Sequence, residues 1–246
     1  MTDETMKDTE MEATTMTKTT AMTGGPMTIK EAIDARHSVR KYQDRPIERE
    51  LVDQLKQLID ECNQQSGLNI QLVLDAPECF KTLLGHYMKF EGTVNYIALI
   101  GKSAMQDLDE ICGYYGQRLV LEAQRMGLNT CWVAGTYSKG KCQATLAADE
   151  KIVCVISIGY GQTQGTEHRS KPLSKVCDLK EEEMPDWFRD GVDAALKAPT
   201  AMNQQRFFVT LKKGEPVITA KRGPLTKIDL GIVKYNFEAA SGRKCK

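Results

Sequence analysis

The sequence predicts an α+β fold, and three observations support this prediction. Apolar residues recur at helical spacing in several segments, and these segments alternate with short strand-like ones along most of the chain. One strand-like segment, residues 152–158, is almost entirely apolar, as expected for a strand at the centre of a sheet. The chain has 246 residues, enough for one large domain or two small ones. Interleaved helices and strands of this length indicate helices packed on sheet.

The first 26 residues differ from the rest of the chain. They are rich in Thr, Met and acidic residues, contain no aromatic residue and show no sustained apolar periodicity. Such a segment cannot bury enough surface to offset the entropy of ordering it. It also lacks the basic-then-apolar layout of a signal peptide. We predict a disordered tail over residues 1–26 and a folded region over 27–246. A translation start assigned too far upstream, with Met27 as the true first residue, is a simpler explanation of the tail than a functional role.

Local signals place the first elements of the folded region. Thr28 followed by Glu31 is a capping box that begins a helix. Apolar residues at helical spacing predict a second helix over residues 48–62, and alternation predicts a strand with one polar face over 69–74.

The remaining elements follow from the same patterns. Residues 96–100 form a short buried strand that we expect Gly101 to end, and Gly127 caps a long amphipathic helix. The other predicted elements are the long helix over about 105–126, the central strand 152–158, a helix over 187–196, a strand over 207–211 with its hairpin partner 217–220, and a closing helix over 228–240.

Composition excludes several classes of function. Lys and Arg total 33, as do Asp and Glu, so no global basic field attracts nucleic acid or an anionic membrane. No apolar run approaches the roughly 20 residues that span a bilayer. The eight cysteines are scattered, without a C-x-x-C pair, which favours free thiols in a reducing cytosol over disulfides or a zinc site. We therefore expect a soluble, cytoplasmic protein that binds neither nucleic acid nor membrane.

A basic segment, Arg-His-Ser-Val-Arg-Lys-Tyr at residues 36–42, follows the first predicted helix. Arg36, Ser38 and Arg40 alternate, so in an extended chain all three project from one side. A phosphate monoester is dianionic and has several acceptor oxygens, which guanidinium groups and a hydroxyl suit well. From these residues alone, a solvated basic end of a helix is the other interpretation.

Two glycine-containing segments carry further polar or reactive residues. In residues 127–135, Cys131 has no neighbouring His or acid to activate its thiol, so we predict a buried small hydrophobe. Residues 159–165 place glycines after a strand, but the spacing G-x-G-x-x-x-G and the absence of a following helix argue against a dinucleotide-binding fingerprint. We interpret the nearby His168 as a surface residue.

Four segments, in their order along the chain, resemble hallmarks of the nitroreductase superfamily of FMN-dependent oxidoreductases. Residues 36–42 are similar to its R-x-S-x-R-x-[FY] phosphate clamp, and residues 127–135 to its G-L-G-x-C-W-x-G-G loop beside the flavin. Residues 167–173 are similar to a basic loop that completes the phosphate pocket. Residues 198–205, Ala-Pro-Thr-Ala-Met-Asn-Gln-Gln, are similar to the A-P-S/T-x-x-N-x-Q stretch that covers the cofactor, although alone they also suit a helix-ending turn.

The resemblance implies a set of site residues. A hydride-accepting flavin N5 needs a hydrogen-bond donor that transfers no proton, and a backbone N–H supplies one, so no side chain is implied as catalytic acid or base. Lys89 has two interpretations of equal weight: it lies near the flavin pyrimidine, or it is an exposed lysine without a role at the flavin. The implied cofactor-binding residues are Arg36, His37, Ser38, Arg40, Arg169 and Lys171 at the phosphate, Lys89 and the backbone of Ala134 and Gly135 at the flavin ring, and Pro199, Thr200 and Asn203 over the cofactor.

The covering stretch is displaced relative to most of that family. There it follows the phosphate clamp closely, and two identical subunits exchange the two motifs; here residues 62–68 take that place, and the stretch comes near the C-terminus. This order resembles the Thermotoga-type subgroup. It implies two half-domains of mixed β-sheet surrounded by helices, over about 27–175 and 176–246, and a monomer that builds a whole site, with a homodimer as the alternative.

The function that the resemblance implies is an FMN-dependent oxidoreductase. NAD(P)H would pass hydride through FMN to a nitroaromatic, a quinone or a similar small-molecule acceptor by a ping-pong mechanism. Two alternatives stay open: a flavoenzyme of the same fold with a different reaction, such as reductive dehalogenation or flavin cleavage, or a non-catalytic flavin-binding or redox-sensing protein.

Overall fold

The computed structural model describes residues 26–82 and 90–246. The tail predicted over residues 1–26 lies outside the described residues except for Pro26, and Lys89 lies outside them as well. The folded region begins with α1 (Ile29–Ala35). The predicted capping box is present, because Glu31 N donates to Thr28 Oγ1 at 3.3 Å and Thr28 N donates to Glu31 Oε2 at 2.7 Å. The chain then leaves α1 in an extended conformation at Arg36.

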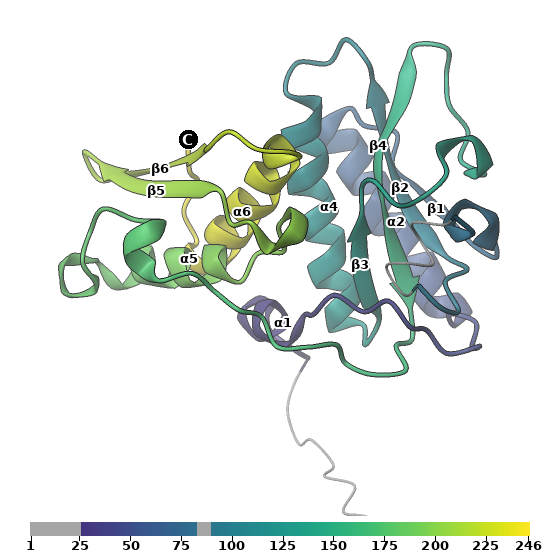
Figure 1. Cartoon of the computed structure of the whole chain (residues 1–246), viewed down its shortest axis with the longest axis horizontal. Coiled ribbons are helices and arrows are strands. Elements are labelled where there is room, and N and C mark those ends of the chain that lie inside the picture. The colour runs from purple at the N-terminus through teal and green to yellow at the C-terminus, as the bar shows by residue number, and fades with distance from the viewer. Residues whose placement is uncertain (1–25, 83–89) are drawn as a thin grey trace, which may run out of the picture.

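A four-stranded sheet lies within the larger of two groups of elements (Figure 1). Its strands are β1 (Gln71–Val73), β2 (Tyr96–Lys102), β3 (Asn129–Val133) and β4 (Glu150–Gly159), in the spatial order β1-β2-β4-β3. The apolar strand β4 lies inside the sheet, as predicted. The strands of this sheet pair antiparallel throughout. Among the described residues, parallel pairing occurs only as isolated bridges, such as that of Ser38 with Thr130. The predicted mixture of parallel and antiparallel pairing is therefore limited to such bridges.

Strand β2 continues past Gly101, where the sequence predicted its end. Gly101 pairs with Lys151 of β4, so the ladder of hydrogen bonds runs through it. A Cβ at Gly101 would lie 2.5 Å from a Leu108 methyl and 2.9 Å from a Leu68 methyl. The glycine is therefore there because two leucines pack against the backbone of the strand, a tertiary requirement that local sequence does not show.

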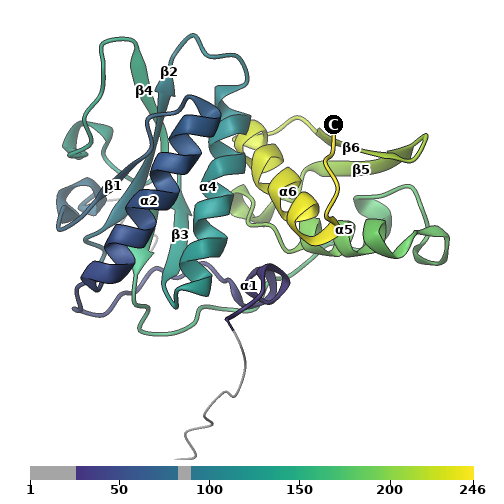
Figure 2. The same cartoon turned by 180° about the vertical axis from the view of Figure 1, so that it is seen from behind.

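Two long helices cover one face of this sheet, as Figure 2 shows. The helix α2 (Arg49–Ser66) extends beyond the predicted end and stops where Gly67 adopts the left-handed conformation, with φ 71°. The helix α4 (Leu108–Arg125) ends as predicted near Gly127 (φ 79°). There Leu128 N donates to Ala123 O at 2.9 Å and Gly127 N donates to Gln124 O at 3.0 Å, the pattern of a Schellman motif.

A second, smaller group of elements lies beside α4 (Figure 1). It consists of α5 (Asp186–Leu196), a hairpin of β5 (Phe207–Lys212) and β6 (Glu215–Ala220), and α6 (Thr226–Ser241). Short 3₁₀ turns complete the described elements: η1 (Pro77–Phe80), η2 (Lys139–Lys141), η3 (Leu173–Lys175), η4 (Glu181–Glu183) and η5 (Ala201–Asn203). The fold is α+β, as predicted.

The two groups meet along α4 and α6, whose backbones approach closely. A Cβ at Gly231 of α6 would lie 1.9 Å from the carbonyl oxygen of Glu110, and one at Gly113 of α4 would lie 2.1 Å from that of Ile228. One hydrophobic cluster continues across the contact, from Leu119 of α4 to Phe188 of α5 and Phe237 of α6. The two groups of elements therefore share this cluster; the half-domains and their boundary near residue 175 stay a prediction.

Candidate flavin-binding site

The segment after α1 lies along the free edge of β3. Ser38 forms a parallel bridge with Thr130, and Val39 N donates to Thr130 O at 3.0 Å. Tyr42 anchors the segment from inside, because its hydroxyl donates to Val39 O at 2.8 Å and shares a 2.8 Å hydrogen bond with Ser157 Oγ. The predicted extended segment is confirmed, and these contacts hold its backbone against the sheet.

Arg36 is a buried cation in this segment. It is only 4% exposed, yet among the described residues its guanidinium has no carboxylate or other hydrogen-bond partner. Burial lowers the pKa of Arg36 to about 10, so the group is still cationic at neutral pH. A buried cation without a counter-ion costs several kcal/mol, roughly, unless an anion binds beside it. This position therefore suits an anionic ligand.

Three nitrogen atoms in this segment and in the loop at residues 167–173 are fully buried and have no hydrogen-bond partner within the described part of the chain; none of them belongs to Arg36. They are His37 Nδ1, Arg40 Nε and His168 Nε2. His168, predicted as a surface residue, is only partly exposed. Its ring is half-buried, and burial and the nearby charge of Arg36 lower its pKa, although the backbone of Leu196 acts to raise it. The same two causes lower the pKa of His37. Because both rings are neutral at physiological pH, each can present an N–H to an acceptor without adding charge.

The loop that contains His168 is bound to the 198–205 segment. Asn203 Nδ2 donates to Arg169 O at 2.9 Å, Gln205 Nε2 donates to the same carbonyl at 2.9 Å, and Lys171 N donates to Gln205 Oε1 at 2.8 Å. The ammonium of Lys171 lies 2.5 Å from Gln204 O. The structure thus joins the two predicted segments, but it uses Lys171 and Asn203 to connect them, while the side chain of Arg169 is exposed.

The backbone of the 198–205 segment is strained. Met202, Asn203 and Gln205 all have positive φ, at 50°, 51° and 42°, in a stretch without glycine. Pro199 is buried at its start, and Thr200 Oγ1 accepts from Gln205 N at 3.0 Å, which closes the turn. Left-handed conformations of this kind cost of order 1–3 kcal/mol each and concentrate at functional sites.

Asp229, a residue that the sequence analysis missed, holds this turn in place. One carboxylate oxygen accepts from Ala201 N at 2.9 Å and the other from Gln204 Nε2 at 2.7 Å. Asp229 is 6% exposed, and burial raises its pKa to about 6 although both hydrogen bonds act to lower it. The available signal was an acidic residue within the apolar start of α6 (Thr226–Ser241).

At the other end of β3 lie the two predicted amide donors, Ala134 and Gly135. Residues 129–133, predicted within a loop, form the strand itself, so the amides follow directly from its end. No acceptor for either N–H is found in residues 26–82 and 90–246, and a Cβ at Gly135 would have no atom within 4 Å. Since a strand rises about 3.4 Å per residue, Ala134 lies roughly 14 Å from Thr130. The cationic cluster and the free amides therefore occupy the two ends of one edge strand.

Cys131, between these ends, agrees with its prediction. It is 2% exposed, and burial raises the pKa of its thiol although Arg40 and Arg36 act in the opposite direction. Its thiol donates to Trp132 O at 3.6 Å. A thiol held neutral in this way packs beside the site and is a poor nucleophile.

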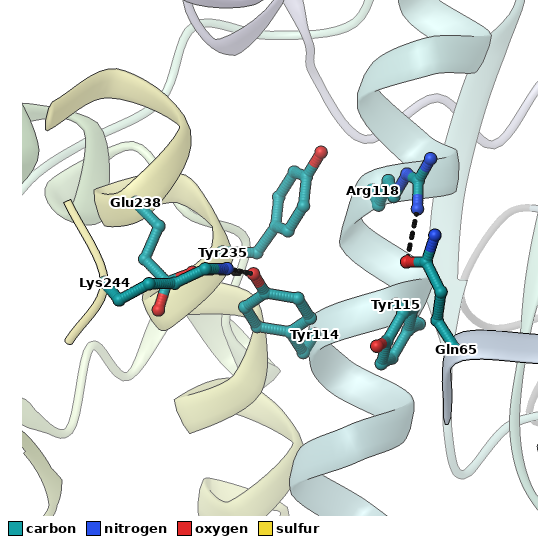
Figure 3. Close-up of a pocket in the computed structure, with 7 residues that line it drawn as sticks. All are labelled: Gln65, Tyr114, Tyr115, Arg118, Tyr235, Glu238 and Lys244. Atoms are coloured by element: carbon teal, nitrogen blue, oxygen red, sulfur yellow. Dashed lines mark hydrogen bonds and ion pairs between the residues drawn. The ribbon is translucent and has the colours of Figure 1, made fainter. Parts of the chain in front are cut away.

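A cavity of about 530 Å³ lies elsewhere, between the end of α2 and the helices α4 and α6 (Figure 3). Its cations are already paired: Arg118 donates to Gln65 Oε1 at 3.0 Å, and Lys244 donates to Glu238 Oε2 at 2.6 Å. This is the opposite of the situation at Arg36. No predicted flavin-site residue lines the cavity, whose lining residues are Gln65, Tyr114, Tyr115, Arg118, Tyr235, Glu238 and Lys244.

The described residues contain no group of three or more His, Cys, Asp or Glu side chains placed to hold a metal ion. No helix among them is both long and apolar enough to cross a membrane. All eight cysteines are free thiols, in agreement with the prediction.

Comparison with known proteins identifies the class. The fold is that of nitroreductases: the putative nitroreductase of Thermotoga maritima MSB8 matches with a TM-score of 0.64 and 22% identity, over 88% of this chain and 85% of that one. The nitroreductase family protein of Streptococcus pneumoniae TIGR4 matches with a TM-score of 0.50 and 11% identity, over 61% of this chain and 98% of that one. No curated protein sequence matches the chain.

The family follows from the sequence itself. The model of the family described as "Putative TM nitroreductase" matches residues 28–241. The chain belongs to this Thermotoga-type family of the nitroreductase superfamily, as the four motifs had suggested. Membership makes it, in general terms, an oxidoreductase of a flavin-dependent class.

Proposed function

We propose that the chain is an FMN-dependent oxidoreductase that transfers hydride from NAD(P)H to a nitroaromatic, a quinone or a similar small acceptor, in alternating half-reactions. When bound, FMN would supply the chemistry of accepting and returning the hydride. The observation that carries the proposal is Arg36, a buried guanidinium without a partner among the described residues.

The residues around Arg36 fit the terminal phosphate of FMN. A dianionic phosphate supplies the missing counter-charge, and its oxygens can accept from Arg36, from Arg40 and from the orphaned nitrogens of His37 and His168. Ser38 lies between the two arginines and adds a hydroxyl. Such a group of donors favours a phosphate monoester over a neutral hydroxyl, so FMN should bind more tightly than riboflavin.

The amides of Ala134 and Gly135 fit the other end of the cofactor. Both N–H groups are available in the described structure, and the space beside Gly135 is open. A backbone donor would orient the flavin and stabilise developing charge without moving a proton. In this proposal no side chain acts as acid or base, and Cys131 contributes packing alone.

The 198–205 segment would cover the cofactor from within the same chain. It is tied to the loop of His168 and Arg169 by Asn203 and Gln205, which places it next to the cationic cluster. In the proposal Pro199 and Thr200 present backbone and hydroxyl to the flavin. One chain would then complete one site, and the protein would work as a monomer. Eight free thiols support a reducing, cytoplasmic setting.

The test is the identity and affinity of the cofactor. The chromophore released from the purified protein by denaturation should have the mass of FMN. In a fluorescence titration FMN should bind at least about 100-fold more tightly than riboflavin, since each charge-assisted hydrogen bond contributes roughly 1.5–3 kcal/mol. Equal affinity for the two compounds would refute the phosphate assignment. Light scattering combined with flavin stoichiometry should give one FMN per monomer, and a flavin shared between two chains would refute the proposed assembly.

A further inference from the structure

Two of the eight cysteines lie together on the face of the sheet opposite α2 and α4. Cys79 belongs to the short turn η1 and is fully buried, whereas Cys142 directly follows η2 and is partly exposed. These two turns pack on each other over the outer end of the sheet (Figure 1). They bring together residues that are far apart in the sequence.

Backbone contacts and packing hold the two cysteines close together. Ser138 N donates to Cys79 O at 2.7 Å, and the Cys142 thiol donates to Ser138 O at 3.5 Å. The Cys79 thiol in turn donates to Ala76 O at 3.9 Å. Gln143 N donates to the Tyr96 hydroxyl at 2.8 Å, and Cys79, Tyr96 and Cys142 pack in one hydrophobic cluster. The two thiols are thus neighbours on one face of the sheet.

The two thiols differ in acidity and in access. Interaction with Cys79 lowers the pKa of Cys142, and Tyr96 and the charge of Lys139 act in the same direction. The same interaction, with burial, raises the pKa of Cys79. A partly exposed, more acidic thiol beside a buried, less acidic one is the arrangement of an attacking and a resolving cysteine.

We propose that Cys142 and Cys79 are a peroxide-reactive dithiol that closes reversibly to a disulfide. The Cys142 thiolate attacks one oxygen of hydrogen peroxide, the O–O bond breaks, and the departing hydroxide takes a proton to become water. The sulfur of Cys79 then attacks the Cys142 sulfenic acid, the S–O bond breaks, and the second hydroxide leaves with the Cys79 proton as water. Two thiols are oxidised, one peroxide is reduced to two waters, and an external dithiol restores the reduced pair. The proposal does not depend on flavin binding.

The experiment is a thiol count and a peptide map of the full chain after brief exposure to hydrogen peroxide. Free thiols titrated in denaturant should fall from eight to six, that is, eight less the two that pair. Proteolysis should yield one cross-linked species, the peptide of Cys79 joined to that of Cys142, and dithiothreitol should separate it. The thiol count and the peptide map of the wild-type protein test the proposal without any variant.

Variants assign the roles. Cys142→Ser should keep all remaining thiols free after peroxide, whereas Cys79→Ser should stop at a sulfenic acid on Cys142 that dimedone traps. Lys139→Ala should slow the reaction several-fold near neutral pH, because a cation that favours the thiolate is removed. Cys245→Ser is the matched control, since Cys245 is equally partly exposed but burial raises its pKa to about 12; that variant should still lose two thiols.

Three outcomes would overturn the proposal. One is a wild-type protein that retains eight thiols after peroxide. Another is a disulfide that joins other cysteines, for example the buried neighbours Cys112 and Cys154, while Cys79 and Cys142 stay free. The third is a Cys142→Ser protein that consumes peroxide and forms a cross-link as fast as wild type.

Discussion

The stretch from α2 to α4 in the larger group and the smaller group from α5 to α6 have the same order of helix, strand, strand and helix, but they differ in the connection after the first helix. Between α2 and β1 the chain crosses residues 67–70 with a single left-handed glycine, and the side chain of Asn63 closes it by accepting from Ile70 N at 2.7 Å. Between α5 and β5 it crosses residues 197–206, with three left-handed residues, none of them glycine.

The difference shows where the molecule stores strain and for what purpose. The first connection is relaxed because a glycine occupies its one unusual position. The second is held by contacts from outside itself, from Asp229 of α6 and from the loop of Arg169. It is also the one that lies beside the cationic cluster. Strain maintained by surrounding contacts at one of two comparable positions supports a functional role for that position.

The largest expected effect comes from Arg36→Met. In the proposed site this change removes a buried cation from the phosphate, so FMN affinity should fall by at least about 100-fold. The flavin-free protein should become more stable, because an unpaired buried charge is replaced by an apolar side chain of similar length. Fluorescence titration and urea unfolding measure the two effects.

Arg118→Met is the matched control for Arg36→Met. Arg118 is partly buried too, but it is paired with Glu61 at 2.9 Å and with Gln65. Its loss should leave FMN affinity unchanged and should not stabilise the flavin-free protein. If both variants behave alike, Arg36 has no special relation to an anion.

The second prediction tests whether the two groups share one interface. Gly231→Ala places a Cβ where the carbonyl oxygen of Glu110 would be only 1.9 Å away, so α4 and α6 must separate. Overpacking against backbone should cost about 3 kcal/mol and lower Tm by roughly 6–12 °C, still in a single transition. Differential scanning calorimetry measures both. Gly140→Ala, where a Cβ would meet no atom within 4 Å, should be close to neutral.

A two-step thermogram for Gly231→Ala, with only one step shifted, would show that the two groups have separate cores. An unchanged Tm would show that the helices are not in close contact at this crossing.

The third prediction concerns the pH dependence that Asp229 gives to the strained connection. Its pKa is raised by burial from 3.8 to about 6, so the folded state binds this proton more tightly than the unfolded state does. Stability from this group is therefore full below pH 4, is lost as the pH rises through 6, and is constant above that. A shift of about two units corresponds to roughly 2–3 kcal/mol.

Asp229→Asn should remove this loss. Because the amide cannot accept both hydrogen bonds, the variant should be less stable than wild type at pH 4, and the gap should narrow or reverse by pH 7. Urea unfolding at the two pH values measures it, with the exposed Asp44→Asn as control. A gap that widens with pH would mean that the carboxylate form is the stabilised one.

The sequence predicted those features of the fold that local residues determine. The helix start at Thr28 and the helix end at Gly127 rest on hydrogen bonds within a few residues, and both were found. The continuation of β2 through Gly101 was not predicted, because it depends on Leu68 and Leu108 packing from elsewhere. Periodicity alone could not show whether a glycine ends a strand or leaves room for a side chain that packs against the strand.

The candidate site divides in the same way. Arg36, Ser38 and Arg40 were predicted together because their alternation is a local pattern, and the structure places them in an extended segment; their role at a phosphate stays a prediction. Asp229 and the burial of His168 were missed because their partners, Ala201 and Leu196, lie about 30 residues away in the chain. Lys171 was predicted at the phosphate, but its ammonium contacts the carbonyl oxygen of Gln204. This contact also could not be predicted locally, since it depends on how two loops meet.

The smallest expected effect compares the two connections directly. Met202 is 83% exposed with φ 50°, so its side chain contributes little packing while its backbone adopts a conformation that favours glycine. Met202→Gly should stabilise the protein by about 0.5–1 kcal/mol, the relief of left-handed strain less the extra entropy of glycine in the unfolded chain. Gly67→Ala, at φ 71° with no close contact, should destabilise it by about 1 kcal/mol for the opposite reason. Urea unfolding of both variants decides the matter: opposite signs support the contrast between a relaxed and a strained connection. A loss of stability in both would mean that Met202 contributes through contacts of its own, and the strain assigned to residues 197–206 would have to be withdrawn at this position.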